Sequence, residues 1–202
     1  MCSSDLHVLG FGGKLCTTPY VNDHEDPESL LKLATECEAR ILYFANPDNP
    51  MGTCWPAEVV QKLIDRVPDG CILMLDEAYC DFAPEGTITK LDMSNPKVLR
   101  FRTFSKAYGM AGVRVGYALG HPDVIAPFDK IRDHFGISRI SQAGALAALA
   151  DQQYLAESID RVKAGRERLY RIARDNGLSP IPSATNFVAM DTGRDAVYAR
   201  AI

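Results

Sequence analysis

Apolar and polar positions alternate along the chain in blocks that predict strands and helices in turn. Continuous apolar runs of strand length occur at 39–45 (ARILYFA) and 71–75 (CILML), as is typical of strands buried on both faces of a sheet. Between them, 56–67 carries apolar residues at helical spacing and begins with a proline, which suits a first helical turn. The order strand, helix, strand predicts an α/β domain with a mainly parallel sheet.

Two further strands are predicted on either side of a loop of small residues. Strand-forming residues fill 98–104, the loop runs over 105–112, and a second strand is expected over 113–119. Nearer the N-terminus, a helix is expected to begin at Asp26, which is placed to cap it and is followed by a proline.

The first six residues do not resemble the start of a domain. Within residues 1–6 (MCSSDL), the stretch CSSDL matches one reading frame of a common sequencing-adapter end. We therefore expect a non-native leader, with His7 continuing a longer natural chain. Sheet-like sequence is expected to begin at once, at 7–9.

Helical periodicity dominates the second half of the chain. In the longest helix one face is apolar and the other carries Arg and Glu, so the apolar face should point inward. That face consists of Leu155, Ile159, Val162, Leu169 and Ile172. The expected elements are a helix over 123–133, a loop over 134–139, helices over 141–150 and 154–176, a strand over 183–191 and the start of another helix.

Composition excludes several classes of function. A hydrophobic content of 47% with 24% charged residues is ordinary for a soluble globular protein, and a net charge of −4 offers no basic surface to nucleic acid or an anionic membrane. No apolar run approaches the roughly 20 residues that span a bilayer, and no secretion signal is visible. The six cysteines are irregularly spaced and include no CxxC, which favours reduced thiols, a cytoplasmic location and no metal site.

Polar residues suited to chemistry follow the predicted strands. Asn49 lies in a loop made rigid by two X-Pro pairs. Asp76 follows the next strand, and Lys106 follows the third. Because ligands bind at the carboxyl ends of parallel strands, we expect these three residues in one site. A lysine there, beside hydroxyls and an arginine, suits imine chemistry on a phosphorylated carbonyl compound.

Each of these residues also has a purely structural explanation. Asp76 would cap a helix, and Asn49 would serve only its own turn. Tyr79 would be a core residue with its hydroxyl at the surface. Lys106 would be a solvated lysine, and Arg114 would pair with a nearby acid. Their joint occurrence is what favours a shared site.

Three motifs together resemble the fold-type I pyridoxal-phosphate aminotransferases. They are NPDNPMGT (46–53), DEAY (76–79) and TFSKAYGMAGVRVGY (103–117), and the closest likeness is to the histidinol-phosphate aminotransferase branch. The resemblance spans about half of a full-length member. It implies a three-layer α/β sandwich, pyridoxal 5'-phosphate as cofactor, and a homodimer with shared active sites. The implied substrates are a small-molecule amino donor, such as an amino phosphate or aromatic amino acid, and a 2-oxo acid acceptor.

The resemblance also implies a division into domains. Residues 7–150 would form the large cofactor-binding domain without its N-terminal part, and 151–202 the long helix and the start of a smaller α+β domain. The phosphate-gripping helix start would lie upstream, and the ring-stacking aromatic and the tyrosine that reaches over from the partner subunit are also missing from these residues. The arginine that binds the substrate carboxylate would lie beyond Ile202. Met51 stands where members usually carry threonine, and Arg139 would face the site, the dimer partner or solvent.

The implied roles of the lysine, aspartate, tyrosine and asparagine follow from the cofactor's chemistry. Lys106 would form the imine with the cofactor aldehyde and later carry a proton. Asp76 would keep the pyridine nitrogen protonated, so that the ring accepts electrons. Tyr79 and Asn49 would hydrogen-bond the ring hydroxyl oxygen.

The phosphate would be bound on the same loop as the lysine. Thr103 and Ser105 would supply hydroxyls, and Arg114 a charge-assisted pair. Glycines would let the backbone approach closely. These are Gly109, Gly112 and Gly116.

Other functions stay open at this point. A decarboxylase or lyase of the same fold carries the same signatures. An aminotransferase-like domain can also serve as an effector sensor behind a DNA-binding helix-turn-helix, which the lack of a basic patch disfavours. A non-functional piece is the remaining alternative.

Overall fold

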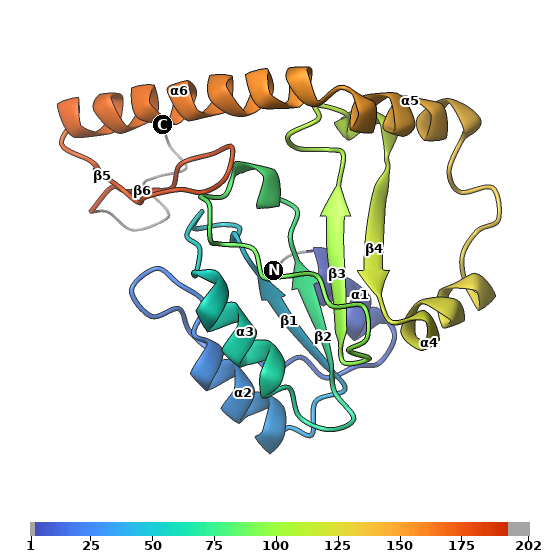
Figure 1. The fold of residues 1–202 in the computed structure, drawn as a ribbon. Helices are drawn as coiled ribbons and strands as arrows, with labels where there is room; N and C mark the ends of the chain where they lie inside the picture. The colour runs from blue at the N-terminus through green and yellow to red at the C-terminus, as the bar shows by residue number, and fades with distance from the viewer. Residues whose placement is uncertain (1–2, 194–202) are drawn as a thin grey trace.

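The structure, a computed structural model, describes residues 3–193 and is built on a four-stranded sheet (Figure 1). The strand order is β1-β2-β3-β4, with the first three strands parallel and the last antiparallel. The strands are β1 (Ile41–Ala45), β2 (Ile72–Asp76), β3 (Val98–Thr103) and β4 (Gly116–Gly120). The prediction of an α/β domain with a mainly parallel sheet is therefore confirmed.

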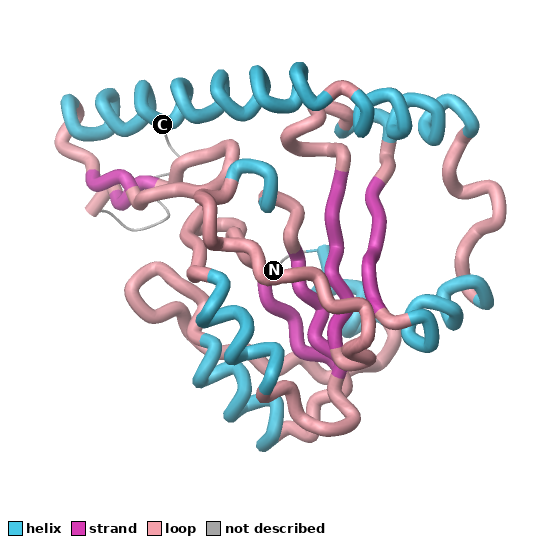
Figure 2. Tube along the Cα trace, in the orientation of Figure 1, coloured by secondary structure: helices cyan, strands magenta, loops and turns pink. Residues whose placement is uncertain are grey.

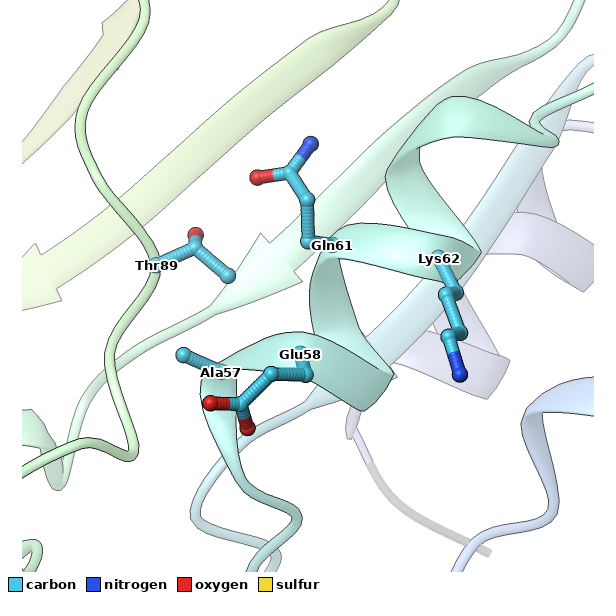
Figure 3. A pocket seen from close by; sticks show the side chains of 5 residues that line it. All are labelled: Ala57, Glu58, Gln61, Lys62 and Thr89. Atoms are coloured by element: carbon cyan, nitrogen blue, oxygen red, sulfur yellow. The ribbon is translucent and has the colours of Figure 1, made fainter.

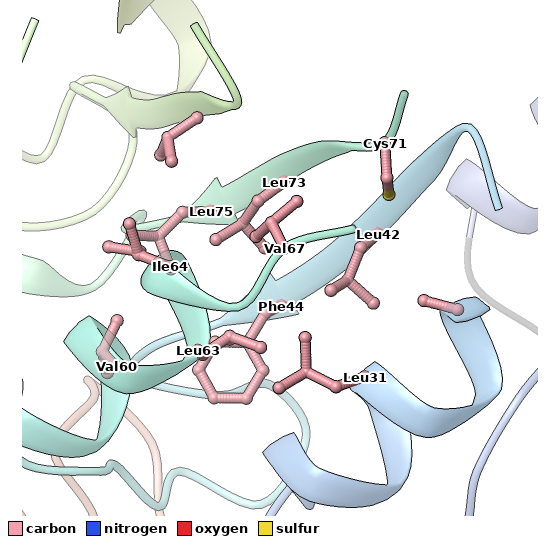
Figure 4. Close-up of a cluster of buried hydrophobic side chains, with 12 residues drawn as sticks. Leu31, Leu42, Phe44, Val60, Leu63, Ile64, Val67, Cys71, Leu73 and Leu75 are labelled. Atoms are coloured by element: carbon pink, nitrogen blue, oxygen red, sulfur yellow. The ribbon is translucent and has the colours of Figure 1, made fainter. Parts of the chain in front are cut away.

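Two helices cover one face of this sheet, α2 (Pro27–Glu36) and α3 (Ala57–Asp65). Asp26 caps α2 as expected, since its Oδ1 accepts a hydrogen bond from Glu28 N at 3.1 Å. The apolar stripes of both helices meet the inward side chains of β1 and β2 in one buried cluster (Figure 4). Its members include Leu31, Leu42, Phe44, Val60, Leu63, Ile64, Val67, Leu73 and Leu75.

The expectation that β1 is buried on both faces is wrong. Its side chains alternate, and Ile41 and Tyr43 are 57% and 45% exposed. Only one face of β1 packs against α2 and α3, because a strand points successive side chains to opposite faces. A continuous apolar run thus does not prove that both faces of a strand are covered.

Two helices cross the carboxyl ends of the parallel strands, α5 (Arg139–Ala150) and α6 (Gln152–Asp175), drawn at the top of Figures 1 and 2. Ala145 of α5 packs with Phe104 and Val115. Leu155 of α6 packs with Tyr79 and Ala107 in a second cluster. The helices therefore fix the loops that follow β2 and β3.

The structure corrects the boundaries of several elements. Residues 7–9 belong to helix α1 (Ser3–Gly10) and pair with no strand among the described residues. The expected helix over 123–133 is only α4 (Pro122–Ile125), followed by a 3₁₀ turn, η3 (Ala126–Lys130). Pro127 lies in this turn and lacks the N–H that an α-helix requires.

The second half of the chain differs from the prediction in three further places. The strand expected over 113–119 begins at Gly116, because the 3₁₀ turn η2 (Ala111–Val113) precedes it. On α6, Leu169 and Ile172 are exposed, since its packing on the site loops involves its first turns. The strand expected over 183–191 is reduced to β6 (Met190–Asp191), which pairs with β5 (Ser179–Pro180).

Between β5 and β6, side chains form hydrogen bonds with backbone groups. Ser183 Oγ donates to Phe187 O at 2.6 Å and accepts from Thr185 N at 3.1 Å, so 183–187 is a loop. The expected final helix lies outside the described residues, and the domain division stays a prediction. Within the described part of the chain, no helix is both long and apolar enough to cross a membrane.

Candidate active site

The register of the sheet brings the ends of β1, β2 and β3 to one edge. Asp76 pairs with Ala45 on one side and with Phe101 on the other. Beyond the strands, Asn46 N donates to Asp76 O at 2.9 Å, and Glu77 N donates to Phe101 O at 2.9 Å. The segments that carry the predicted site residues thus leave the sheet side by side.

Tyr79 joins the predicted residues of all three segments. Its hydroxyl accepts a hydrogen bond from Asn49 Nδ2 at 3.2 Å. Its ring centroid lies 4.9 Å from Lys106 Nζ. Tyr79 is 5% exposed, and it also packs in the cluster beneath α6, so its role in the core and its place in the site are compatible.

Asp76 is fixed through both carboxylate oxygens. Its Oδ1 accepts from Ala78 N at 2.9 Å and its Oδ2 accepts from Tyr43 Oη at 2.7 Å. The bond to Ala78 is a turn within the loop and caps no helix, because the 3₁₀ turn η1 (Cys80–Phe82) is preceded by Tyr79. Each oxygen keeps a lone pair for a further donor.

The 103–115 loop carries the remaining predicted residues. Thr103 Oγ1 accepts from Ser105 N at 3.0 Å, so this hydroxyl also shapes the turn that leads to the lysine. Arg114 is exposed, adopts a left-handed conformation with φ of 55°, and donates to Ala111 O at 2.9 Å. Among the described residues neither Lys106 nor Arg114 has a carboxylate within ion-pair distance.

At one position beside this loop, a side chain is excluded for a steric reason. Gly116 pairs with Thr103, and a Cβ at Gly116 would lie 2.9 Å from Arg102 O. Glycine therefore allows β3 and β4 to approach at the end where the lysine loop begins. Arg139 is exposed in the first turn of α5, and its three possible orientations stay open.

A buried ion-pair network supports the DEAY segment. Glu77 is 2% exposed and receives Arg100 Nη1 on Oε1 at 2.8 Å and Arg102 Nε on Oε2 at 2.9 Å. Arg100 also donates to Thr89 Oγ1 at 2.6 Å. These bonds hold Glu77, the residue after Asp76, against β3, and so help to fix the position of the Asp76 carboxylate.

Sequence reasoning missed two residues that contact the site. Tyr43 belongs to the run that the sequence predicts to be buried on both faces. Side chains alternate along a strand, so Tyr43 lies on the other face of β1 from Leu42 and Phe44. The Phe187 ring meets Tyr79 edge-on, with centroids 5.5 Å apart. No local pattern signals the contact of Phe187, because Phe187 and Tyr79 lie 108 positions apart in the sequence.

A hollow on the outer side of α3 is unrelated to this site. Figure 3 shows its lining, and none of the predicted site residues contributes to it. The lining residues are Ala57, Glu58, Gln61, Lys62 and Thr89. Among the described residues the cysteines are free thiols, and no group of three or more His, Cys, Asp or Glu is arranged to hold a metal ion.

Comparison with known proteins agrees with this geometry. The family model for class I and II aminotransferases matches residues 10–201. A histidinol-phosphate aminotransferase of Nitrosospira multiformis is 39% identical over 187 residues, which cover 91% of this chain and 47% of the relative. An aromatic amino acid aminotransferase of Mycobacterium avium is 33% identical, covering 93% of this chain and 54% of the relative.

A solved structure of an aminotransferase is also similar to this chain. The crystal structure of histidinol-phosphate aminotransferase from Sinorhizobium meliloti in complex with pyridoxal-5'-phosphate is 53% identical, with a TM-score of 0.96. The match covers 98% of this chain and 54% of that one. The chain therefore spans about half the length of the relatives that it matches.

Proposed function

The chain belongs to the class I and II aminotransferase family, and from this premise we propose that the full-length protein is a pyridoxal-phosphate-dependent aminotransferase. It moves an amino group between an amino acid or amino phosphate and a 2-oxo acid such as 2-oxoglutarate. The names of the relatives support an amino donor that resembles histidinol phosphate or an aromatic amino acid. They do not favour a decarboxylase, a lyase or an effector sensor.

One observation carries the proposal. Tyr79 contacts both Asn49 and Lys106, and it follows Asp76, the last residue of β2, by three residues. These contacts, with Asp76 at the end of β2, support a site that combines an amine, a carboxylate, an amide and a phenol. This is the set of groups that a substituted pyridine aldehyde requires.

The residues present fit the cofactor. The carboxylate of Asp76 has two oxygens that are oriented by Ala78 and Tyr43 yet keep lone pairs for a ring N–H. Lys106 has no competing carboxylate among the described residues. The hydroxyls and the guanidinium of the 103–115 loop offer the donors that a phosphate dianion needs.

When bound, pyridoxal phosphate supplies an electron-accepting ring that stabilises negative charge on the substrate carbon. The chain's own residues then have distinct tasks. The Lys106 amine attaches the cofactor and afterwards holds and moves the proton of the substrate Cα. Asp76 keeps a proton on the ring nitrogen. Asn49 and Tyr79 orient the ring through its hydroxyl oxygen.

The remaining proposed roles concern the phosphate and the assembly. Thr103, Ser105 and Arg114 bind the phosphate group. We further propose a homodimer with shared active sites, located in the cytoplasm, as the family resemblance implies. Light scattering of the purified full-length protein tests the dimer, and a monomer mass would contradict it.

A half-reaction screen of the full-length protein tests the function. We expect histidinol phosphate or an aromatic amino acid to convert the absorption band of the bound cofactor faster than aspartate or alanine does. Release of carbon dioxide in place of amino transfer would identify a decarboxylase instead. The Lys106→Ala variant should lose the covalent cofactor band and turnover while still binding the cofactor weakly. A covalent band retained in that variant would refute the assignment of Lys106.

A further inference from the structure

Glu25 is a half-buried carboxyl group behind the site that none of the proposed roles uses. Its Oε2 accepts a hydrogen bond from Ala45 N at 3.1 Å, and its backbone carbonyl accepts one from Trp55 Nε1 at 2.7 Å. Ala45 is the residue of β1 that pairs with Asp76. The Glu25 side chain therefore touches the strand end at the position level with the Asp76 carboxylate.

The Glu25 carboxyl also lies within hydrogen-bonding reach of Asp48. Asp48 is buried, and its Oδ1 accepts from Tyr20 Oη at 3.0 Å while its Oδ2 accepts from Met51 N at 3.1 Å. The Asp48 backbone closes the same loop, because its N donates to Thr53 O at 2.9 Å. Asp48 thus anchors the segment 46–52, in which the next residue is Asn49.

Two contacting carboxyl groups in a desolvated place share a proton, because both cannot ionise cheaply. Burial, together with the charges of Asp48 and Asp76, raises the pKa of Glu25 to about 8. Burial also raises the pKa of Asp48, but hydrogen bonds from Met51 N and Tyr20 and the nearby His24 oppose this. The proton therefore resides on Glu25 at neutral pH.

We propose that Glu25 is a positioning residue of the cofactor site. As a neutral acid it donates its proton to a carboxylate oxygen of Asp48 and accepts from Ala45 N. It thereby joins the loop that carries Asn49 to the strand end beside Asp76. This inference rests on the proposed function, since its consequence is the placement of groups around pyridoxal phosphate.

Two variants of the full-length protein separate this role from simple packing. Glu25→Gln keeps both bonds, because the amide donates to Asp48 and its oxygen accepts from Ala45 N. Glu25→Ala loses both and leaves a buried donor unsatisfied. We expect cofactor affinity to fall roughly tenfold in Glu25→Ala and less than about twofold in Glu25→Gln.

A spectroscopic readout accompanies the affinities. In Glu25→Ala the absorption band of the bound cofactor should titrate at a shifted pH, because Asn49 no longer holds the ring hydroxyl in place. In Glu25→Gln the band should titrate as in the wild type. Equal damage in both variants would overturn the proposal, since it would mean that the ionised carboxylate is required. Wild-type affinity and an unshifted band in Glu25→Ala would overturn it as well.

The shared proton can be observed without cofactor. In the apo form of the full-length protein, carbon-13 detection of the Glu25 carboxyl should show a titration midpoint near 8. The midpoint should fall in Asp48→Asn, which removes the neighbouring charge. A wild-type midpoint near the ordinary glutamate value would overturn the proposal.

The outcomes for the function and for this inference are distinguishable. A wild-type protein that binds no pyridoxal phosphate would overturn the proposed function, and the role of Glu25 with it. A wild-type protein that binds the cofactor, together with a Glu25→Ala variant that binds it equally well, would overturn the inference alone. Thermal unfolding of Glu25→Ala shows whether a loss of binding reflects misfolding, and Glu25→Gln supplies the folded comparison.

Discussion

The Asp76 carboxylate receives one hydrogen bond on each oxygen, from Ala78 N and from Tyr43 Oη. Two anchored oxygens fix the direction in which the carboxylate points, which matters more for chemistry than for folding. Tyr43 lies on a face of β1 that is open in the described residues. Its bond to Asp76 gives this exposed aromatic residue a role at the site.

Asp76→Asn should therefore reduce turnover far more than stability. We expect kcat of the full-length protein to fall by about two orders of magnitude or more, as when a preorganised charge is removed. Tyr43→Phe is the matched control, because it removes one bond and keeps the carboxylate, and its loss should be much smaller. Steady-state kinetics and thermal unfolding of both variants check this. An Asp76→Asn enzyme with wild-type kcat would remove Asp76 from its proposed role.

The buried ion pairs of Glu77 make a prediction about stability. Glu77→Gln should lower the free energy of unfolding by about 3–5 kcal/mol, since the buried charge of Arg100 and the partly buried charge of Arg102 would lose their carboxylate partner. Glu157→Gln on α6 is the control, because its pair with Arg161 is exposed and should contribute less than about 1 kcal/mol. Urea unfolding measures both. Similar losses in the two variants would contradict the prediction.

At the scale of elements, the two pairs of helices have different roles. One pair lies on a face of the sheet, and the other crosses its end. The pair α2 and α3 supplies the apolar layer against β1 and β2, and this layer contains none of the predicted site residues. The pair α5 and α6 packs on the loops after β2 and β3 that carry Tyr79 and Lys106. The first pair thus closes the largest buried apolar cluster, and the second pair packs on the loops that carry the site residues.

Leu63 of α3 tests the first of these layers. It is almost fully buried in the cluster of Figure 4, so Leu63→Ala should cost about 2–5 kcal/mol through lost burial and a residual cavity. Lys62→Ala, on the exposed side of the same helix, should change the free energy of unfolding by less than about 0.5 kcal/mol. Denaturant titrations of the full-length variants give both values. A comparable cost for both would refute the assignment of the buried face.

For the whole molecule, Glu25 links stability to pH. Its pKa is raised to about 8 in the folded chain and is near 4.5 when unfolded. Between these values the folded chain keeps a proton that the unfolded chain has lost, so this contribution to stability is full at low pH. It is lost as pH rises towards 8.

Glu25→Gln should remove this dependence. Relative to the wild type, the variant should become more stable by on the order of a few kcal/mol as pH rises from 5 to 8.5, because its amide does not titrate. Urea unfolding of the full-length protein at several pH values measures the difference. A stability difference that stays constant with pH would show that Glu25 ionises normally.

The sequence by itself determined the order of elements and the placement of chemistry at strand ends. Periodicity, proline positions and caps are local properties, so the strand at 71–75, the cap Asp26 and the polar residue after each strand were readable. The three motifs are also local in sequence, so they were sufficient to indicate the family. Pro127 shows that a local signal was also overlooked, since it divides the expected helix over 123–133.

The tertiary structure alone decided which residues meet. The contact of Phe187 with Tyr79, the bond from Tyr43 to Asp76 and the carboxyl pair Glu25–Asp48 join residues at least 23 positions apart. It also decided that only one face of β1 is covered among the described residues. The physical reason is that such contacts depend on strand register and helix packing, which no short window of sequence contains.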